Sequence, residues 1–288
     1  MATPAPARIV ERTDKPESCP ITTENYAYLQ KHVYAQSGIV LDSDKHYLLE
    51  SRLIPIVRQE RLASLNDLCA RMRAEAVPTL SKQVVEAMTT NETLFFRDVA
   101  PFQALRTQVI PELQKLRADS KRLRFWSAAS SSGQEAYSLA MMLLEMGLGA
   151  WNIEILGTDL SEQILERARQ GKYMQLEVNR GLPAPCLVKY FAREGQQWQL
   201  KDEVRRMARF QRFDLRQSMA GLGVFDVVLC RNVLIYFDVE TKKKILGEIR
   251  KSLVSGGYLV LGGAETTINL DDKYQRTPVG PAILYRVP

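Results

Sequence analysis

Arg124-Phe125-Trp126-Ser127-Ala128 is typical of a buried β-strand, and the small residues Ala129-Ser130-Ser131-Ser132-Gly133 follow it directly. A helix is predicted over 134–146. Small residues between a strand and a helix let a ligand approach the backbone, but they also occur where a strand and a helix merely pack together. Three serines and one glycine match a pyrophosphate loop poorly, since such a loop needs several glycines. The stretch therefore predicts a strand–turn–helix unit with a turn open to a ligand.

Strands and helices alternate on both sides of this unit. Strands are predicted at 152–159, 225–230, 258–262 and 282–287, and helices at 99–116, 161–170 and 239–253. This alternation predicts an α/β fold with a parallel, doubly wound sheet. The last strand lacks a following helix, so we expect it to insert as an antiparallel hairpin. Gly256-Gly257 is expected to end the helix predicted at 239–253.

One region, 171–213, breaks the alternation. It contains two prolines, an aromatic pair and then a run of aromatic and basic residues. We expect an inserted small β subdomain here. Its basic residues are either a solvated face or a docking surface for an acidic partner, and the sequence leaves both open. They are Lys201, Arg205, Arg206, Arg209 and Arg212.

The N-terminal third has a different character. Residues 1–20 are rich in Pro, Ala and charge and lack the apolar core of a signal peptide, so a disordered tail is expected. Residues 21–90 have helical periodicity and predict a small helical domain, with 91–288 as the α/β domain. Thr22 or Thr23 is expected to cap the first helix and Gly38 to end it. Pro55 should begin or kink a helix.

Composition narrows the class of protein. The chain has 288 residues, 45% of them apolar, and a net charge of +6. No run approaches the length of a membrane span. Four widely spaced cysteines without a CxxC pair suggest reduced thiols in a cytoplasmic protein. Because there are only two histidines, both in the N-terminal third, we expect neither a histidine-based dyad nor a zinc site.

The segment 91–98, Asn-Glu-Thr-Leu-Phe-Phe-Arg-Asp, precedes the α/β domain. Alternation along an extended chain would place Asn91, Thr93 and Phe95 on one side. A polar cluster with an apolar backing is typical of a ligand-facing loop. The alternative is a plain seam between two domains.

Two further segments leave the carboxyl ends of predicted strands. Asp159 ends one strand, where an acidic side chain hydrogen-bonds ribose hydroxyls in dinucleotide-type folds. The alternative is that Asp159 caps the next helix with Glu162 as its partner. Arg231, Asn232 and Tyr236 follow another strand near the expected switch point, or else form a helix cap with aromatic packing. An acidic residue without a phosphate loop favours an adenosine ligand that lacks a long phosphate chain.

Taken together, the chain resembles the CheR family of chemotaxis receptor methyltransferases from about residue 21 onward. The matching segments are Ser37-Gly38-Ile39-Val40-Leu41, Ser51-Arg52-Leu53, Asn91-x-Thr93-x-Phe95-Phe96-Arg97, Trp126-Ser127-Ala128-Ala129, Gly133-x-Glu135-x-Tyr137-Ser138, Gly157-Thr158-Asp159 and Cys230-Arg231-Asn232-Val233-x-Ile235-Tyr236-Phe237. The resemblance implies a Rossmann-like sheet that binds S-adenosylmethionine (AdoMet) and methylates glutamate side chains on membrane chemoreceptors. The product would be S-adenosylhomocysteine (AdoHcy).

The resemblance also implies site residues. Those expected to line the AdoMet site are Asn91, Thr93, Arg97, Glu135, Asp159, Asp214, Leu215, Arg231 and Asn232. Asp159 would bind the ribose and Glu135 would lie near the methionine amino group. Arg97 and Tyr236 would flank the point of methyl transfer as catalytic residues. The receptor's cytoplasmic helices are the expected partner, and the inserted subdomain could hold a receptor's C-terminal peptide by strand addition.

Three departures from the family pattern stand out. Gly133-Gln134-Glu135-Ala136-Tyr137-Ser138 replaces Gly-Glu-Glu-Pro-Tyr-Ser, but the second carboxylate remains. Asp214 stands where the family usually has Asn, and a carboxylate cannot donate a hydrogen bond as an amide does. Pro55 and Ile56 fall where arginine is common. Receptor recognition is therefore assigned to the basic residues that remain, Arg52, Arg58 and Arg61.

The expected chemistry suits the residues available. A glutamate carboxylate has a pKa of about 4.3, so it is already ionised at neutral pH and needs no general base. Methyl loss leaves a neutral sulfide, so no general acid is needed either. We expect Arg97 to orient the carboxylate. The alternatives are an AdoMet enzyme with another acceptor such as RNA, supported by the basic 201–212 run, and a non-catalytic AdoMet-binding module. Nucleic-acid binding and membrane insertion are not expected.

Overall fold

This computed structural model describes residues 20–42, 46–74 and 78–288, so the expected tail at 1–20 lies outside the described residues except for Pro20. The described chain divides into two compact units. One contains the residues up to Val33 together with 41–88, and the other contains 34–40 together with 89–288. Within the described part of the chain, no helix is both long and apolar enough to cross a bilayer.

The first unit is helical, as predicted. Its helices are α1 (Thr23–Ser37, whose last turn belongs to the second unit), α2 (His46–Gln59), α3 (Leu65–Ala74) and α4 (Pro78–Met88). Thr22 caps α1, because its hydroxyl accepts a hydrogen bond from the Asn25 amide at 3.2 Å. Pro55 lies inside α2 and does not begin it. The proline is exposed, so its ring leaves the buried face of Leu53 and Ile56 undisturbed.

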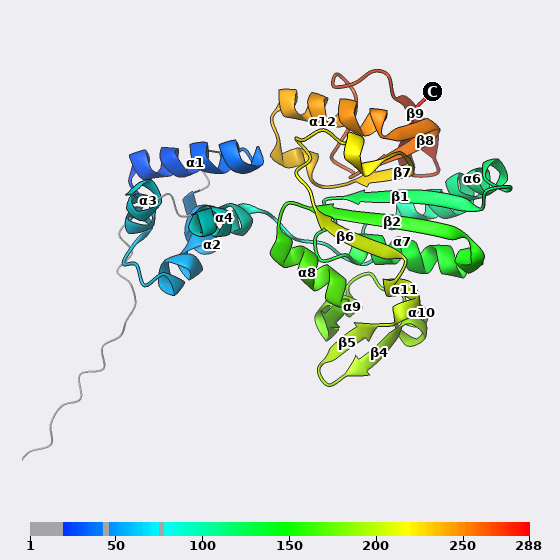
Figure 1. The fold of residues 1–288 in the computed structure, drawn as a ribbon, viewed down its shortest axis with the longest axis horizontal. Helices are drawn as coiled ribbons and strands as arrows, with labels where there is room; N and C mark the ends of the chain where they lie inside the picture. The colour runs from blue at the N-terminus through cyan, green and yellow to red at the C-terminus, as the bar shows by residue number, and fades with distance from the viewer. Residues whose placement is uncertain (1–19, 43–45, 75–77) are drawn as a thin grey trace, which may run out of the picture. The chain divides into compact units, whose positions relative to one another are not determined.

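The second unit is built on a seven-stranded sheet, and the prediction of a doubly wound α/β fold is confirmed (Figure 1). Its strands are β1 (Arg122–Ala128), β2 (Asn152–Asp159), β6 (Ala208–Arg212), β7 (Phe225–Cys230), β8 (Leu253–Leu261), β9 (Gln275–Val279) and β10 (Ala282–Arg286). The order is β6-β2-β1-β7-β8-β10-β9. The first five strands in this order are parallel. The β9–β10 hairpin is antiparallel, as expected for the end of the chain.

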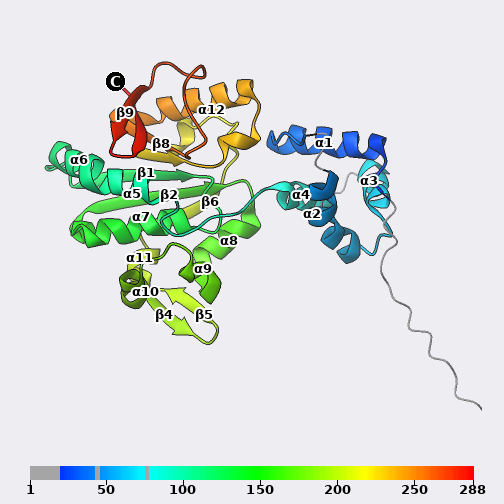
Figure 2. The same cartoon turned by 180° about the vertical axis from the view of Figure 1, so that it is seen from behind.

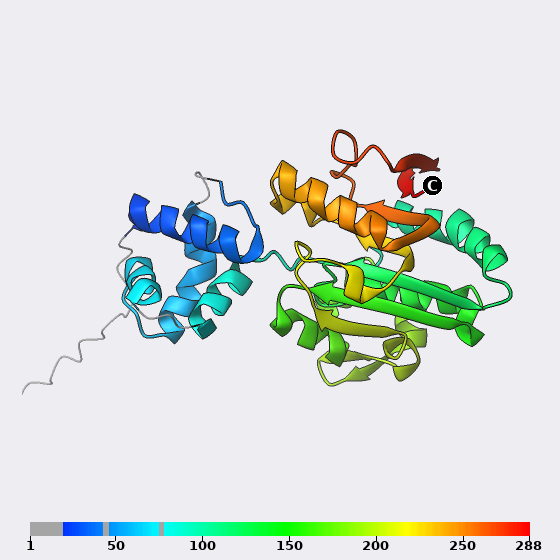
Figure 3. The ribbon, with the colours of Figure 1, turned by 45° about the horizontal axis from the view of Figure 1, so that its top comes forward.

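Helices cover both faces of this sheet (Figure 3). One face carries α5 (Val99–Ala104), η1 (Leu105–Val109), α6 (Ile110–Leu116) and α7 (Gln134–Glu145), and the other carries α12 (Val239–Lys251). In β7, Val227 and Leu229 join the first apolar cluster, while Val228 and Cys230 join the second. A strand buried on both faces has a continuous apolar sequence, which is why β7 was recognisable.

The remaining elements connect these layers. They are η2 (Leu148–Ala150), α8 (Glu162–Gln170), η3 (Ala220–Leu222) and η4 (Leu234–Tyr236). Gly256-Gly257 does not stop a helix, contrary to expectation. α12 ends at Lys251, and the two glycines lie within β8, where Gly256 has φ +77°. Strand β8 begins at Leu253, five residues before the predicted start at Tyr258, because Leu253 was assigned to the preceding helix and the less buried Ser255-Gly256 interrupt the apolar pattern.

A small antiparallel sheet follows α8 (Figure 2). Its strand order is β3 (Lys172–Met174), β5 (Gln197–Leu200), β4 (Phe191–Glu194), with α9 (Gln175–Asn179), α10 (Ala184–Tyr190) and α11 (Asp202–Arg205) nearby in the chain. The insert was expected to reach residue 213. The last part of that range is instead β6, which pairs with β2 at the edge of the main sheet. An edge strand is half exposed, so its polar residues concealed it in the sequence.

The basic residues of 201–212 are bound within the protein. Arg209 contacts Glu154 at 2.8 Å, Arg205 contacts Asp202 at 2.7 Å, and Arg206 contacts Asp202 at 3.6 Å. Lys201 and Arg212 donate to backbone carbonyls. Two carboxylates, Asp202 and Glu154, thus pair with three of the five cations, and these pairs favour the interpretation as a solvated face.

Candidate functional site

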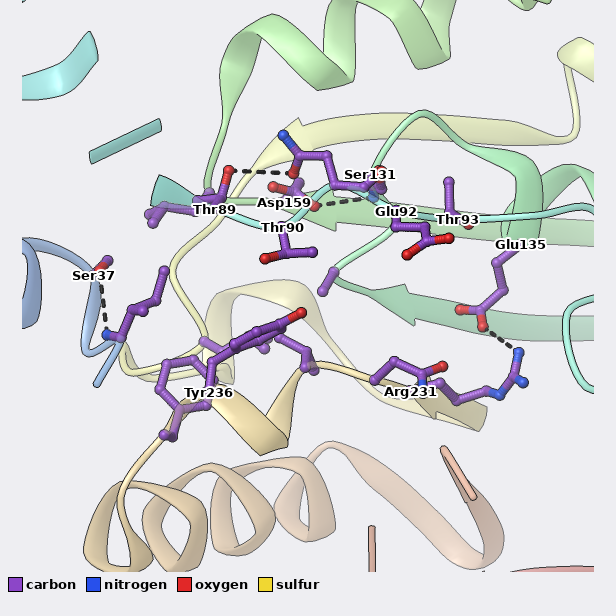
Figure 4. Close-up of a pocket in the computed structure, with 18 of the residues that line it drawn as sticks. Ser37, Thr89, Thr90, Glu92, Thr93, Ser131, Glu135, Asp159, Arg231 and Tyr236 are labelled. Atoms are coloured by element: carbon purple, nitrogen blue, oxygen red, sulfur yellow. Dashed lines mark hydrogen bonds and ion pairs between the residues drawn. The ribbon is translucent and has the colours of Figure 1, made fainter. Parts of the chain in front are cut away.

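A pocket lies at the carboxyl ends of β1, β2, β6 and β7, where the parallel sheet changes its direction of winding (Figure 4). Ligands bind at this position in open α/β sheets. All nine residues predicted to bind the cofactor line it, and so does Tyr236. The other lining residues are Ser37, Ile39, Thr89, Thr90, Glu92, Ala129, Ser131, Leu160, Phe213, Val233 and Phe237. Every lining residue belongs to the second unit.

Asp159 is anchored at the end of β2. Its two carboxylate oxygens accept hydrogen bonds from the backbone amides of Ser131 and Ser161, each at 3.0 Å. The alternative role as cap of the next helix does not hold, because Ser161 caps α8 by accepting from Ile164 N at 3.3 Å. Asp159 is thus fixed beside the β1–α7 turn with its carboxylate at the pocket.

The β1–α7 turn needs an unusual backbone. Ala129 has φ +70° and Ser131 has φ +50°, a region that costs energy for residues other than glycine. Contacts on both sides hold the turn: the Ser130 amide donates to Thr158 O at 2.7 Å, and the Ser131 hydroxyl donates to Asn91 O at 2.8 Å. The turn and the 91–98 loop are therefore joined at the pocket.

A buried ion-pair network lies at one end of the pocket. Arg231, with 2% of its side chain exposed, donates to Glu135 Oε2 at 2.9 Å, to Asp98 Oδ2 at 2.9 Å and to Arg97 O at 2.7 Å. The other Glu135 oxygen accepts from the Ser127 hydroxyl at 2.7 Å. Partnering of this kind is what permits a charge to be buried. Arg231 thereby fixes both the Glu135 carboxylate and the backbone of the 91–98 loop at Arg97.

The 91–98 loop differs from the simple alternation expected of it. Asn91 and Thr93 line the pocket, but Phe95 is fully buried against Tyr173 and Phe191 of the inserted segment. The cause is a turn at 95–98, where Phe96 and Asp98 have positive φ. The turn directs Arg97 into the pocket, and there its guanidinium donates to Glu92 O at 3.1 Å.

Glu265 organises the site, although no sequence pattern points to it. Its carboxylate accepts four backbone amides at 2.7 to 2.9 Å, from Gly262, Asn232, Val233 and Leu234. These bonds hold Asn232 at φ +58° and fix the start of the loop that leads to Tyr236. A carboxylate far along the chain from the loop that it holds carries no local sequence signal.

Asp214 is engaged by a neighbour. Its carboxylate accepts from the Arg216 amide and pairs with the Arg216 guanidinium, with a shortest contact of 2.7 Å. Arg216 has no sequence signature that predicts this role. Ser37 and Ile39 also line the pocket without having been predicted to do so, although both lie in a segment that resembles the family.

The three arginines assigned to receptor recognition lie outside this pocket, in the helical unit. Arg52 donates to Met88 O, the last carbonyl of α4, at 2.7 Å. Arg58 in the last turn of α2 and Arg61 just beyond it are exposed. Arg52 therefore has an internal role, while the other two face solvent.

Comparison with known proteins agrees with this architecture. Residues 24–89 match the family model "CheR methyltransferase, all-alpha domain", and residues 91–282 match "CheR methyltransferase, SAM binding domain". "Chemotaxis protein methyltransferase Cher2" of Pseudomonas putida is 42% identical over 274 residues, covering 92% of this chain and 99% of the relative. "Chemotaxis protein methyltransferase 1" of Pseudomonas aeruginosa is 45% identical over 255 residues, covering 86% and 92%. A chain with this sheet, this pocket and these matches belongs to the CheR methyltransferase family, and its larger domain binds AdoMet.

Proposed function

We propose that this methyltransferase transfers the methyl group of AdoMet to glutamate side-chain carboxylates of chemoreceptors, forming methyl esters. The observation that carries the proposal is the pocket at the sheet's switch point, where Asp159, Glu135 and Arg97 converge. The relatives named as chemotaxis methyltransferases, matched over nearly their whole length, support the choice of substrate. In this proposal the helices within residues 21–90 recognise the substrate, and 91–288 carry the catalytic site together with the pocket residues Ser37, Ile39, Thr89 and Thr90.

The lining residues suit AdoMet in their chemistry. Ile39, Leu160, Phe213, Leu215 and Phe237 provide apolar walls for an adenine ring. Asp159 accepts from ribose hydroxyls, and Glu135 binds the methionine amino group. The site has no glycine-rich phosphate loop, which agrees with a ligand that has no phosphate. Asn91, Thr93, Asn232 and the backbone around them supply the remaining polar contacts.

The residues near the proposed acceptor are suited to orientation. Bound AdoMet supplies a methyl group on a positively charged sulfur. Arg97 holds the glutamate carboxylate, and Tyr236 forms the opposite wall. Because the carboxylate is already ionised, no side chain has to remove a proton. Positioning of this kind contributes up to about 7–11 kcal/mol in well-aligned reactions.

The direct test is methyl transfer from labelled AdoMet to a receptor cytoplasmic fragment. We expect label that is released by mild base, as a methyl ester is, and no label on a fragment whose candidate glutamates are changed to alanine. Base-stable label would mean a different acceptor. AdoHcy binding without any turnover would instead indicate a non-catalytic module.

We infer that Arg58 and Arg61 contact acidic residues of the receptor helix. Both are exposed and lie close together in the chain at the end of α2, whereas Arg52 is occupied by Met88 O. Arg58→Ala combined with Arg61→Ala should raise the KM for the receptor fragment and leave the AdoHcy Kd unchanged. An unaltered KM would remove both from recognition. The cytoplasmic side of the membrane, where these receptor helices lie, is the proposed location of the enzyme.

A further inference from the structure

The segment Tyr34–Val40, which we call the strap, forms part of the pocket wall far along the chain from the rest of the site. It contains the last turn of α1 and the residues just after it. Ser37 and Ile39 line the pocket and are almost fully buried. The strap belongs to the same compact unit as the sheet, so the pocket depends on how it is held.

Arg216 holds the strap through its backbone. The guanidinium donates to Tyr34 O at 3.3 Å, to Ala35 O at 3.1 Å and to Gln36 O at 2.6 Å. These carbonyls lie in the last turn of α1, where the helix end favours a cation. The Tyr34 carbonyl also accepts from the Gly38 amide at 2.7 Å. The other edge of the guanidinium pairs with Asp214, which itself lines the pocket. One side chain therefore connects the strap to the part of the pocket wall that contains Asp214.

Two other contacts fasten the strap. The Tyr34 hydroxyl donates to Asp238 Oδ2 at 2.7 Å, and the Val40 amide donates to Tyr236 O at 2.9 Å. Gly38 turns the chain at φ +74°, and a Cβ there would lie 2.7 Å from Cδ of Arg216. The strap is therefore packed closely against the side chain of Arg216.

The strap lies at the end of the pocket that is farther from Glu135 and Arg231 (Figure 4). Ser37 is at one end, Glu135 and Arg231 are at the other, and Asp159 lies between them (Figure 4). If Glu135 binds the methionine end and Asp159 the ribose, which are assignments of the proposed function, the strap borders the adenine.

We propose that Arg216 is a positioning residue for the cofactor: with Asp214 it latches the strap closed over the adenosine end of the pocket. Binding and latching are then reciprocal, since a ligand that contacts the latched strap favours the latched form. A protein whose strap is unlatched must close it on binding, so its apparent Kd is the Kd of the closed form divided by the fraction of molecules in which the strap is closed. Asp214 supplies the acidic partner of the latch, at 2.7 Å from the Arg216 guanidinium.

The test compares two ligands by calorimetry, AdoHcy and 5′-methylthioadenosine, which lacks the amino-acid part. Arg216→Gln should raise the Kd of both by the same factor, about tenfold for a strap closed about a tenth of the time. Glu135→Gln should raise the AdoHcy Kd and leave that of methylthioadenosine unchanged. Arg206→Gln, an exposed arginine outside the pocket, should change neither.

Further measurements separate latching from general stability. Arg216→Lys keeps the positive charge but loses the planar guanidinium. Its Kd for each ligand should therefore lie between those of the wild type and Arg216→Gln. In the wild type, methylthioadenosine should slow amide exchange at 36–40, and Arg216→Gln should speed that exchange in the free protein. Should Arg216→Gln fail to fold, Tyr34→Phe removes another anchor and should raise both Kd values by a smaller common factor.

Unchanged Kd values in Arg216→Gln and Tyr34→Phe would overturn the latch, and so would a rise for AdoHcy alone. No receptor is used in these measurements. Failure of receptor methylation would therefore leave the latch standing, and failure of the latch would leave the proposed substrate untouched.

Discussion

Arg97 lines the pocket. Among the described residues it makes no ion pair, and its guanidinium donates to Glu92 O. Arg97→Ala should lower turnover about 100-fold or more, because the glutamate carboxylate loses its orientation. The AdoHcy Kd should change by only a few fold, since Asp159 and Glu135 remain. Turnover and calorimetry on the same preparation check this, and wild-type turnover in the variant would exclude Arg97 from the mechanism.

Glu265 is a second single residue that shapes the site, because its carboxylate accepts hydrogen bonds from backbone amides. Replacing its carboxylate by the amide of Gln brings an NH₂ group toward four N–H donors. Glu265→Gln should therefore lower the free energy of unfolding by about 1–3 kcal/mol and raise the AdoHcy Kd, because the 232–234 loop loses its fixed shape. Urea unfolding and calorimetry measure both. Glu240→Gln, at an exposed side chain on α12, is the matched control and should alter neither.

At the scale of elements, Glu154 joins three neighbouring strands. Lying on β2, it pairs with Arg124 of β1 at 2.7 Å and with Arg209 of β6 at 2.8 Å. The hydrogen bond from Arg124, with that from Arg209, lowers the pKa of Glu154 to about 2 against the effect of partial burial. The pair therefore stabilises the edge of the sheet where β6 is added.

This pKa predicts how stability depends on pH. The folded pKa is below the ordinary value of 4.5, so the stabilisation is complete above about pH 4.5 and is lost as the pH falls toward 2. Glu154→Gln should cost about 1–2 kcal/mol at pH 7, and the difference from wild type should shrink between pH 4.5 and pH 3. Urea unfolding across this range measures it. A difference that stays constant with pH would contradict the assignment, and Glu194→Gln, an exposed pair with Lys172, serves as the control.

How far the sequence predicts the elements depends on burial. Strands β2 and β7 were predicted with the bounds that the structure has, because each contains an apolar run buried in the sheet, at 155–156 in β2 and at 227–230 in β7. Strand β6 was assigned to the insert, since Arg209 and Arg212 obscure an edge strand whose partner Glu154 is distant in the chain. The turn at Phe96 was missed because a positive φ at phenylalanine has no signature in the sequence.

At the scale of the whole molecule, the pocket belongs to one unit. AdoHcy at about 100 times its Kd should stabilise that unit by about 2.7 kcal/mol. Amides of β1, β2 and β7 that exchange by unfolding should then slow about 100-fold, whereas those of α2 to α4 should not. Hydrogen exchange with and without AdoHcy measures this. Equal protection of α2 to α4 would show that the two units unfold together.

The site residues that lie at or directly after the end of a strand could be predicted from the sequence. Asp159, Arg231 and Asn232 were found because the ends of parallel strands meet at one edge. Arg216 and Glu265 were not, because their partners lie as far as 182 and 33 residues away in the chain. Whether such distant residues meet depends on the paths of the loops, and those paths are determined only by the packing of the whole domain.

The way the pocket is divided along the chain has a consequence for biosynthesis. The strap leaves the ribosome first, whereas Glu265, which fixes the 232–234 loop, is added more than 200 residues later. At about 5–20 residues per second, this interval lasts about 10–45 s. A nascent or truncated chain that stops before Glu265 has the strap and most of the wall but not the residue that shapes the loop beside Tyr236. We therefore expect tight AdoMet binding only in chains whose translation has passed Glu265.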